Sequence, residues 1–206
     1  MDFIDEYYAD KDLSLLKKLT LIIPTYNRNY YLSRCLWYHA HFPFGEIIVA
    51  DSSPEEKKVV NRETVQKIRE MFGANIQYLE YEPETEKYGG DIYRKWGDAV
   101  QHVETEYSQI VTDKEFLIPT TANKCIGYLE QHHDYSGSIG IRYDLQQEGW
   151  FNPWSPNPIS FEEDTILERF KKYNSTEYPD ELVLSIQRAE IHKVYYENLA
   201  NYEIDD

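Results

Sequence analysis

The stretch IVTDKEFLIP, residues 110–119, holds the two carboxylates whose spacing is best suited to chemistry. Asp113 and Glu115 stand between two apolar runs, and an extended chain would place both on one side and Lys114 on the other. Oxygen ligands of this kind suit Mg²⁺ or Mn²⁺. The alternative is a polar turn between a strand and a helix, with Lys114 paired to a neighbouring residue.

Further polar groups follow the ends of two apolar runs. After the first run, the turn PTYNR at 24–28 offers backbone and side-chain groups, and the expected contacts are Pro24, Thr25, Tyr26 and Asn27. After the second run, the carboxylate of Asp51 is placed to accept a hydrogen bond from a base N–H or a ribose hydroxyl. The structural alternative for Asp51 is a helix cap or Asx turn before Pro54.

A later helix adds two cations to these candidates. Its apolar face consists of Ile92, Trp96, Ala99, Val100 and Val103. Arg94 and Lys95 lie off that face, where they could reach a base or a diphosphate. The alternative for both is a solvated helix surface.

The elements that must position these groups alternate between strand and helix. The periodicity predicts strands over 19–24, 46–51, 75–81, 107–112 and 136–145, with helices over 29–41, 54–72, about 90–103 and after Pro119. Strands separated by helices pair in parallel through right-handed crossovers, which predicts a doubly wound, Rossmann-like α/β sheet. In the strand order 3-2-1-4, the first and fourth strands are neighbours. The turn at 24–28 and the acids at 113–115 should therefore face one crevice.

The expected organisation is a single domain over 1–206. Its α/β core covers 19–145, and a loop with a helical C-terminal segment covers 146–206. That segment begins with a stretch rich in Pro, Trp and Asn, continues with helices near 160–173 and 187–200, and shows no closing strand. It is interpreted as an incomplete acceptor part.

Composition excludes several functional classes. The net charge of −16 argues against nucleic-acid binding and against a polybasic membrane contact, so a bound phosphate compound would need locally reversed charge. No apolar run approaches 18 residues and the acidic N-terminus lacks signal-peptide features, so we expect a cytoplasmic protein without a transmembrane segment. Cys35 and Cys125 are expected as reduced core residues. Motifs for Rossmann dinucleotide binding, the P-loop and the HExxH zinc site do not occur.

Several segments together resemble the family 2 glycosyltransferases, which have the GT-A nucleotide-sugar-binding fold. The likeness is carried by LIIPTYNR, YLSRCL and EIIVADSS within residues 19–53, by GGDIYRKWGDAV, and by IVTDKEFLIP. In the last segment the family usually has an Asp-rich DDDF-like sequence, from which Lys114 and Glu115 depart. A weaker likeness to a bacterial branch continues to about residue 200.

The resemblance implies a sugar transfer from a nucleotide-diphosphate donor to a hydroxyl of a saccharide or other acceptor, with inversion. Thr25, Tyr26 and Asp51 would hold the nucleotide, helped by Arg94. Asp113 and Glu115 would hold ribose and a Mn²⁺ or Mg²⁺ ion that neutralises the leaving group. Trp150 and Trp154 would stack on a sugar, or pack in the core.

The general base that such a transfer needs is expected beyond the metal segment. Within SFEEDTILERF, Asp164 is the candidate, although a capping box from Ser160 to Glu163 explains these acids structurally. Asp144, Glu148 or no residue of this chain are the alternatives.

Two other functions remain open from the sequence. The chain is alternatively a catalytically inactive, glycosyltransferase-like nucleotide-binding or assembly module, because the acidic segment is altered and no base is evident. A nucleotidyltransferase on a similar sheet is less favoured, since no Gly-rich phosphate loop follows the first strand. A homo-oligomer is compatible with the sequence, but no pattern indicates one.

Overall fold

The computed structural model describes residues 3–83, 89–145, 149, 151–153, 159–175 and 183–200. Helix α1 (Phe3–Tyr8) and the 3-10 helix η1 (Ser14–Lys18) come first. Strands β1 (Leu19–Thr25), β2 (Glu46–Asp51), β3 (Ile76–Glu80) and β4 (Tyr107–Ile110) then alternate with α2 (Asn29–His39), α3 (Glu55–Phe72), α4 (Gly89–Gln101) and α5 (Pro119–Gln131). The remaining elements are β5 (Gly137–Ser138), β6 (Tyr143–Leu145), β7 (Phe151–Pro153), α6 (Ile166–Ser175), β8 (Ile186–Arg188) and α7 (Ala189–Ala200).

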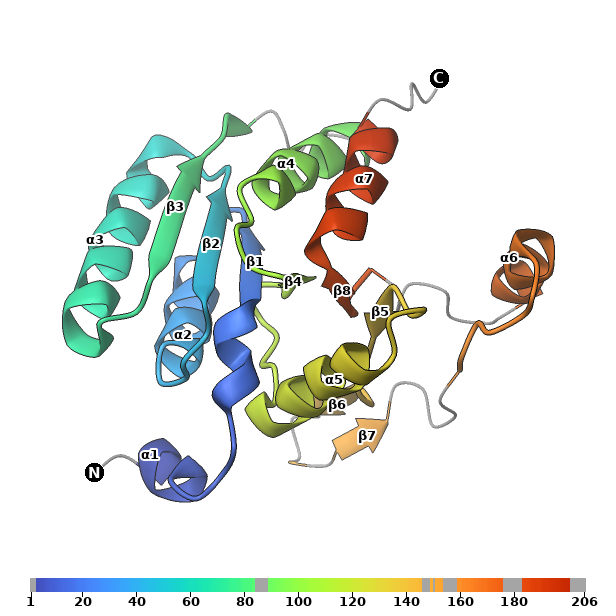
Figure 1. Cartoon of the computed structure of the whole chain (residues 1–206). Coiled ribbons are helices and arrows are strands. Elements are labelled where there is room, and N and C mark those ends of the chain that lie inside the picture. The colour runs from blue at the N-terminus through green and yellow to red at the C-terminus, as the bar shows by residue number, and fades with distance from the viewer. Residues whose placement is uncertain are drawn as a thin grey trace.

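Six strands form one mixed sheet in the order β3-β2-β1-β4-β8-β5. The pairs β1–β2, β2–β3 and β1–β4 are parallel, whereas β8 runs antiparallel to both β4 and β5. The predicted order 3-2-1-4 is confirmed for the four parallel strands. The carboxyl ends of β1 and β4 therefore meet where the strand order reverses (Figure 1).

The helices begin and end where their local chemistry requires. Pro54 precedes α3, whose first turn carries Glu55 and Glu56, and acids stabilise the positive end of the helix dipole. Gly73 ends the helix in the left-handed region at φ 65°, a conformation that glycine adopts without strain. These signals explain why the predicted boundaries at 54 and 72 agree with the structure.

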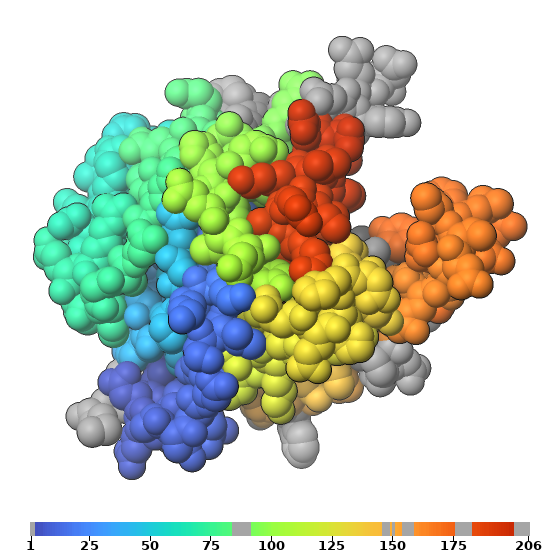
Figure 2. Space-filling model, viewed as in Figure 1, coloured from blue at the N-terminus to red at the C-terminus, as the bar shows by residue number. Residues whose placement is uncertain are grey.

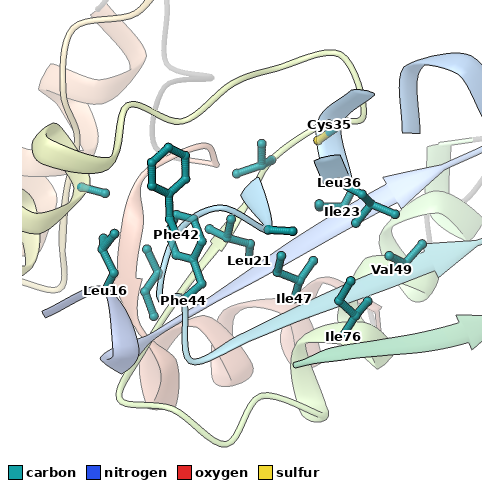
Figure 3. Packing of buried hydrophobic residues seen from close by; sticks show 14 of the residues in the cluster. Leu16, Leu21, Ile23, Cys35, Leu36, Phe42, Phe44, Ile47, Val49 and Ile76 are labelled. Atoms are coloured by element: carbon teal, nitrogen blue, oxygen red, sulfur yellow. The ribbon is translucent and has the colours of Figure 1, made fainter. Parts of the chain in front are cut away.

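One face of the sheet carries the larger core. Alternate residues of the strands, including Leu21 and Ile23 of β1 and Val49 of β2, point toward α2, α3 and α5. Figure 3 shows these side chains packed with Cys35 and Leu36 of α2. Burial of each large aliphatic side chain contributes about 1.5–3 kcal/mol to folding, so this layer fixes the helices that surround the strand ends. Cys35 and Cys125 are free and buried, as predicted.

The opposite face is covered by α4 and α7, which lie side by side (Figure 1). Ile22 and Ile48 from the sheet pack there against Ala99 and Val100 of α4 and Tyr196 of α7. Helices on both faces make the sheet doubly wound, as the sequence predicts.

The C-terminal half departs from the predicted elements in three places. The helix predicted near 160–173 is α6, which begins at Ile166. The strand predicted over 136–145 is two short strands in different sheets, because β5 joins the main sheet and β6 pairs with β7. Strand β8 was not predicted, yet it pairs with β4 through Tyr107 and Ser108 and thereby extends the sheet. A strand of three residues is too short to show a periodicity of its own.

Helix α6 lies away from the sheet. In Figure 2 it forms an orange lobe that stands out from the main body, and none of its residues is buried. Among the described residues, no helix combines the length and apolar character needed to cross a bilayer.

Candidate functional site

The candidate site lies at the carboxyl ends of β1, β2 and β4. The strand register places Thr25 directly beside Asp51, and the Val111 amide continues the pairing of β4 with β1 by donating to the Ile22 carbonyl. Asn27 has a φ of 54°, a left-handed conformation that asparagine tolerates, and its amide donates to Ser53 Oγ at 2.8 Å. The turn after β1 is thus held against the end of β2.

Thr25 and Asp113 are in direct contact, as the switch-point argument requires. Thr25 Oγ1 donates to Asp113 Oδ2 at 2.8 Å, and both side chains are buried. Arg28 places Nη1 at 3.4 Å from the other oxygen, Asp113 Oδ1. The carboxylate is 2% exposed whereas the Arg28 side chain is 51% exposed, so the guanidinium is the group that solvent meets.

Asp51 is fully buried and surrounded by donors from its own chain. Its Oδ2 accepts from Asn61 Nδ2 at 2.6 Å and from Tyr78 OH at 2.5 Å, while its Oδ1 accepts from the Ser53 amide at 2.7 Å. The last contact is the Asx turn expected as the structural alternative. Burial and donation to this carboxylate both raise the pKa of Tyr78. A nucleotide contact by Asp51 stays a prediction.

Lys95 and Arg94 differ sharply in position. Lys95 is 2% exposed, and its Nζ donates to Ser52 Oγ at 2.9 Å. Ser52 in turn donates its amide to the Thr25 carbonyl, so Lys95 joins the hydrogen-bonded network at the strand ends. Arg94 is exposed on α4. The solvated-surface alternative therefore does not hold for Lys95.

The acidic segment is a turn rather than an extension of β4, which ends at Ile110 instead of 112. The Thr112 amide donates to Glu115 Oε2 at 2.9 Å, and the Glu115 amide donates back to the Thr112 carbonyl at 3.0 Å. Arg142 Nη2 lies 2.8 Å from Glu115 Oε1. Lys114 is exposed. Among the described residues, the ion pairs of this turn are thus made by Asp113 with Arg28 and by Glu115 with Arg142, and not by Lys114 as the turn alternative supposed.

Two residues of α2, Cys35 and His39, lie against the turn at 112–117. His39 is fully buried, with Nδ1 at 2.8 Å from the Cys35 carbonyl and Nε2 accepting the Leu117 amide at 3.1 Å. Burial lowers the pKa of His39 to about 4, which keeps the ring neutral and able to accept. Burial, with the nearby carboxylates of Asp113 and Glu115, raises the pKa of the Cys35 thiol. That thiol is therefore an inert packing group.

The chain was compared with protein families, curated sequences and solved structures. No protein-family model and no curated protein sequence matches the chain. Among solved structures, S. aureus TarS residues 1–349 in complex with UDP-GlcNAc superposes with a TM-score of 0.56 at 19% identity, over 86% of this chain and 47% of that one. The mannosyltransferase PcManGT from Pyrobaculum calidifontis, in complex with GDP-Man and Mn²⁺, superposes with a TM-score of 0.50 at 17% identity, over 68% and 42% of the two chains. The fold is GT-A-like.

The GT-A-like chain spans less than half the length of these matched structures, 47% and 42%. The likeness to other solved chains is equally low in sequence, with full-length TarS at 20% identity and 29% of its length covered. The likeness therefore confirms the fold predicted from the sequence. The site residues depend on the geometry of this chain alone.

The side-chain contacts at the GT-A-like site do not favour a divalent cation. Each carboxylate has a guanidinium beside it, Arg28 at Asp113 and Arg142 at Glu115, and these positive charges would repel a metal ion there. Within the described part of the chain, no three His, Cys, Asp or Glu side chains gather where they could hold a metal. The predicted pair of metal ligands, Asp113 and Glu115, thus finds no support in these contacts.

The predicted general base lies on the α6 lobe. Asp164 is exposed just before α6, and its role stays a prediction. The capping box of this helix is formed by Thr165 and Glu168, whose hydroxyl–amide and carboxylate contacts are reciprocal, and not by Ser160 and Glu163. Glu163 pairs with Lys172 instead. The candidates Glu148, Trp150 and Trp154 lie outside the described residues.

Two hollows of about 520 Å³ and 560 Å³ lie at the other, amino-terminal edge of the sheet. Their lining includes Glu46, the first residue of β2, and Tyr107, the first of β4. None of the predicted site residues lines either hollow. The strand-end network is the better candidate because it gathers polar groups from three strands at the switch point.

Sequence reasoning missed the residues that hold the predicted ones. Arg28 was visible in the PTYNR turn, where a cation next to a strand end is a signal. Asn61, Tyr78 and Arg142 gave none, because each reaches the site from an element far along the chain.

Proposed function

We propose that this chain is a glycosyltransferase that binds a nucleotide-diphosphate sugar at the carboxyl ends of β1, β2 and β4. The observation that carries the proposal is the contact of Thr25 with Asp113, which joins two strand ends at the switch point of a GT-A-like sheet. Open α/β sheets bind ligands at this position. Two chains of the same fold, TarS and PcManGT, were solved with UDP-GlcNAc and GDP-Man.

In the proposed complex, the base and ribose contact the turn at 24–27 and the buried groups beside it. Pro24 and Thr25 are buried, whereas Tyr26 is 40% exposed and can present its ring to a ligand. Asp113 offers carboxylate oxygens to a ribose hydroxyl. Lys95, Arg28 and Arg94 supply positive charge toward a diphosphate.

The proposed reaction transfers the sugar with inversion. The acceptor hydroxyl oxygen forms a bond to the anomeric carbon as the bond from that carbon to the phosphate oxygen breaks, and the nucleoside diphosphate leaves. The acceptor's proton passes to a carboxylate acting as general base, for which Asp164 remains the proposed residue. The acceptor is a saccharide or another hydroxyl compound.

Nucleotide binding is the test of this function. Calorimetric titration of the full chain with UDP, GDP and CDP is expected to show one preferred nucleotide. Asp113→Asn should weaken the binding of that nucleotide by about tenfold or more, because a charge-assisted hydrogen bond and the support of Thr25 are lost. The absence of binding by all three nucleotides, with and without Mn²⁺, would refute the proposal.

Glu130→Gln is the matched control. Glu130 also accepts hydrogen bonds from a neutral hydroxyl and a cation, Tyr107 OH and Lys18 Nζ. It does so at the amino-terminal edge of the sheet, so the substitution should leave nucleotide affinity unchanged. Equal losses in both variants would show that the effect of Asp113→Asn is one of folding.

A second function is favoured by a specific observation. Both acids of the altered segment are engaged by arginines, and the predicted base is exposed on a lobe that stands away from the sheet. These features fit a glycosyltransferase-like nucleotide-binding or assembly module without catalysis. Hydrolysis of UDP-GlcNAc or GDP-mannose by the purified chain, measured as released nucleoside diphosphate, distinguishes an active transferase from such a module.

A further inference from the structure

We propose that Arg28 and Arg142 take the place of a divalent cation, so that this chain binds nucleoside diphosphates without metal. The inference rests on the proposed function, since it names the groups that receive the diphosphate of the donor. It differs from the complex of PcManGT, which was solved with GDP-Man and Mn²⁺.

The first argument is the charge balance of the turn after β4. Asp113 and Glu115 carry two negative charges, and a divalent cation would neutralise them. In this chain Arg28 lies 3.4 Å from Asp113 and Arg142 lies 2.8 Å from Glu115, which supplies the same two positive charges. The carboxylates are therefore compensated by groups that belong to the protein.

The second argument is accessibility. The Asp113 side chain is 2% exposed and Glu115 is 24% exposed, whereas Arg28 and Arg142 are 51% and 32% exposed. A ligand that approaches from solvent therefore meets guanidinium groups more readily than carboxylate oxygens. Guanidinium presents several N–H donors in a planar fork that matches phosphate oxygens, and a carboxylate on its inner side holds it in place.

The third argument is the repulsion that a metal ion would meet. At Glu115 it would lie beside the Arg142 guanidinium, which is 2.8 Å from Oε1, and at Asp113 beside the Arg28 guanidinium, which is 3.4 Å from Oδ1. Like charges at such distances repel unless the arginine moves away, and its departure removes a charge-assisted contact of the carboxylate. The arginine-bound arrangement is therefore favoured over metal binding.

The fourth argument is the charge of the whole chain. A net charge of −16 repels a diphosphate, and fixed cations must reverse the field locally. The described strand ends hold Lys95 in the interior and the two arginines at the surface. This arrangement removes the local excess of negative charge without an ion from solution.

The experiment measures binding of the preferred nucleotide among UDP, GDP and CDP by calorimetry, first in EDTA and then with MnCl₂. We expect dissociation constants that agree within about threefold, because no metal takes part. In EDTA, Arg28→Gln and Arg142→Gln should each lower the affinity for the nucleoside diphosphate by about tenfold. The affinity for the matching nucleoside, measured by competition, should change by less than about twofold.

The nucleoside readout separates a diphosphate contact from a structural role. An arginine that only supported the turn would weaken nucleoside and nucleoside diphosphate alike. Arg69→Gln is the control substitution, because Arg69 bonds to the Ile76 carbonyl at the other edge of the sheet, and it should leave both affinities unchanged. Electron paramagnetic resonance of added Mn²⁺ should show the spectrum of the free ion in the presence of the chain.

Three outcomes would overturn the inference. A nucleotide affinity that rises more than tenfold with Mn²⁺ contradicts it while leaving the proposed function intact. An unchanged nucleotide affinity in both arginine variants contradicts the assigned contacts, and so does a loss of nucleoside affinity equal to the loss of nucleoside diphosphate affinity. No nucleotide binding under any condition overturns the inference together with the proposed function.

Discussion

Asp51 illustrates at the residue scale how a predicted ligand contact can also be a structural anchor. Its carboxylate joins the end of β2 to Asn61 of α3 and to Tyr78 of β3. Asn61 in turn accepts from Asn29 at the start of α2, at 2.8 Å. One buried carboxylate thus connects four elements at the edge where the nucleotide is proposed to bind.

Asn61→Leu tests this anchor. The substitution keeps the side-chain size but removes a donor from a buried carboxylate, which should lower the free energy of unfolding by about 2–4 kcal/mol. Urea denaturation followed by circular dichroism measures the loss. Tyr78→Phe also removes one donor from Asp51, but it should cost less, because Asn61→Leu additionally removes the acceptor of Asn29. A loss below about 0.5 kcal/mol for Asn61→Leu would show that water replaces its contact.

A buried histidine makes the turn 112–117 sensitive to pH. The pKa of His39 is lowered to about 4, as is the pKa of His192, because burial disfavours the charged ring. In the unfolded chain both should titrate near 6.5. The unfolded state therefore binds more protons below that value. Stability is full above pH 6.5 and is lost as the pH falls toward 4.

We expect the free energy of unfolding to fall by about 2 kcal/mol for each histidine between pH 7.5 and pH 5. His39→Leu should flatten that dependence by about half, although it also removes the acceptor of the Leu117 amide. His133→Gln, at an exposed position, serves as control. A pH dependence in His39→Leu as steep as in the unaltered chain would contradict the assignment.

At the element scale, the approach of β2 to the start of β1 depends on a glycine. The Gly45 amide donates to the carbonyls of Leu16 and Leu19. A Cβ on Gly45 would lie 2.3 Å from the Lys17 carbonyl oxygen and 2.7 Å from Thr105 Cγ2. The first contact is with backbone, so it cannot be relieved by a rotamer change. Only a residue without a Cβ lets η1 and β2 meet at this distance.

Gly45→Ala is therefore expected to destabilise the chain by about 2–4 kcal/mol, since the clash must move backbone or break both amide contacts. Gly127→Ala is the matched control. A Cβ at Gly127, in α5, would lie 3.5 Å from Leu15 Cδ1, which is an ordinary contact distance. Alanine should therefore stabilise the helix interior by about 0.5–1 kcal/mol. Thermal unfolding of the two variants should shift in opposite directions. A shared direction would contradict the contact geometry.

At the scale of the whole molecule, charge opposes compactness. The chain carries 37 acidic and 21 basic residues, and like charges repel more strongly in the folded state than in the expanded one. Exposed ion pairs, such as Lys11 with Asp10, contribute little to offset this repulsion. Salt screens interactions beyond a Debye length of about 10 Å at 0.1 M.

Raising NaCl from about 20 mM to about 300 mM, which shortens the Debye length roughly fourfold, should therefore raise the melting temperature by about 2–5 °C. Differential scanning calorimetry at pH 7.5 measures the change. Potassium chloride at the same concentrations serves as the comparison, and the rise in melting temperature should not depend on the cation. An unchanged or lower melting temperature would show that local ion pairs dominate the electrostatics.

The sequence by itself determined the alternation of strands and helices in the first part of this fold. Apolar runs such as 19–24 and 46–51, with a capped helix at 54–72, are local signals, and the structure confirms them within one or two residues. Crossover handedness and strand order then follow from general rules, which is why Thr25 and Asp113 were expected in one crevice. The buried state of the cysteines followed from the same periodicity.

Only the tertiary structure decided what surrounds those residues. Arg142 reaches Glu115 from the segment before β6, and β8 pairs with β4 from a position late in the chain. Asn61 and Tyr78 close on Asp51 from two other elements. Such contacts carry no period along the sequence, because they depend on which side chains meet after the helices pack. The strand ends were therefore predictable from local pattern, while the partners that set their charge were not.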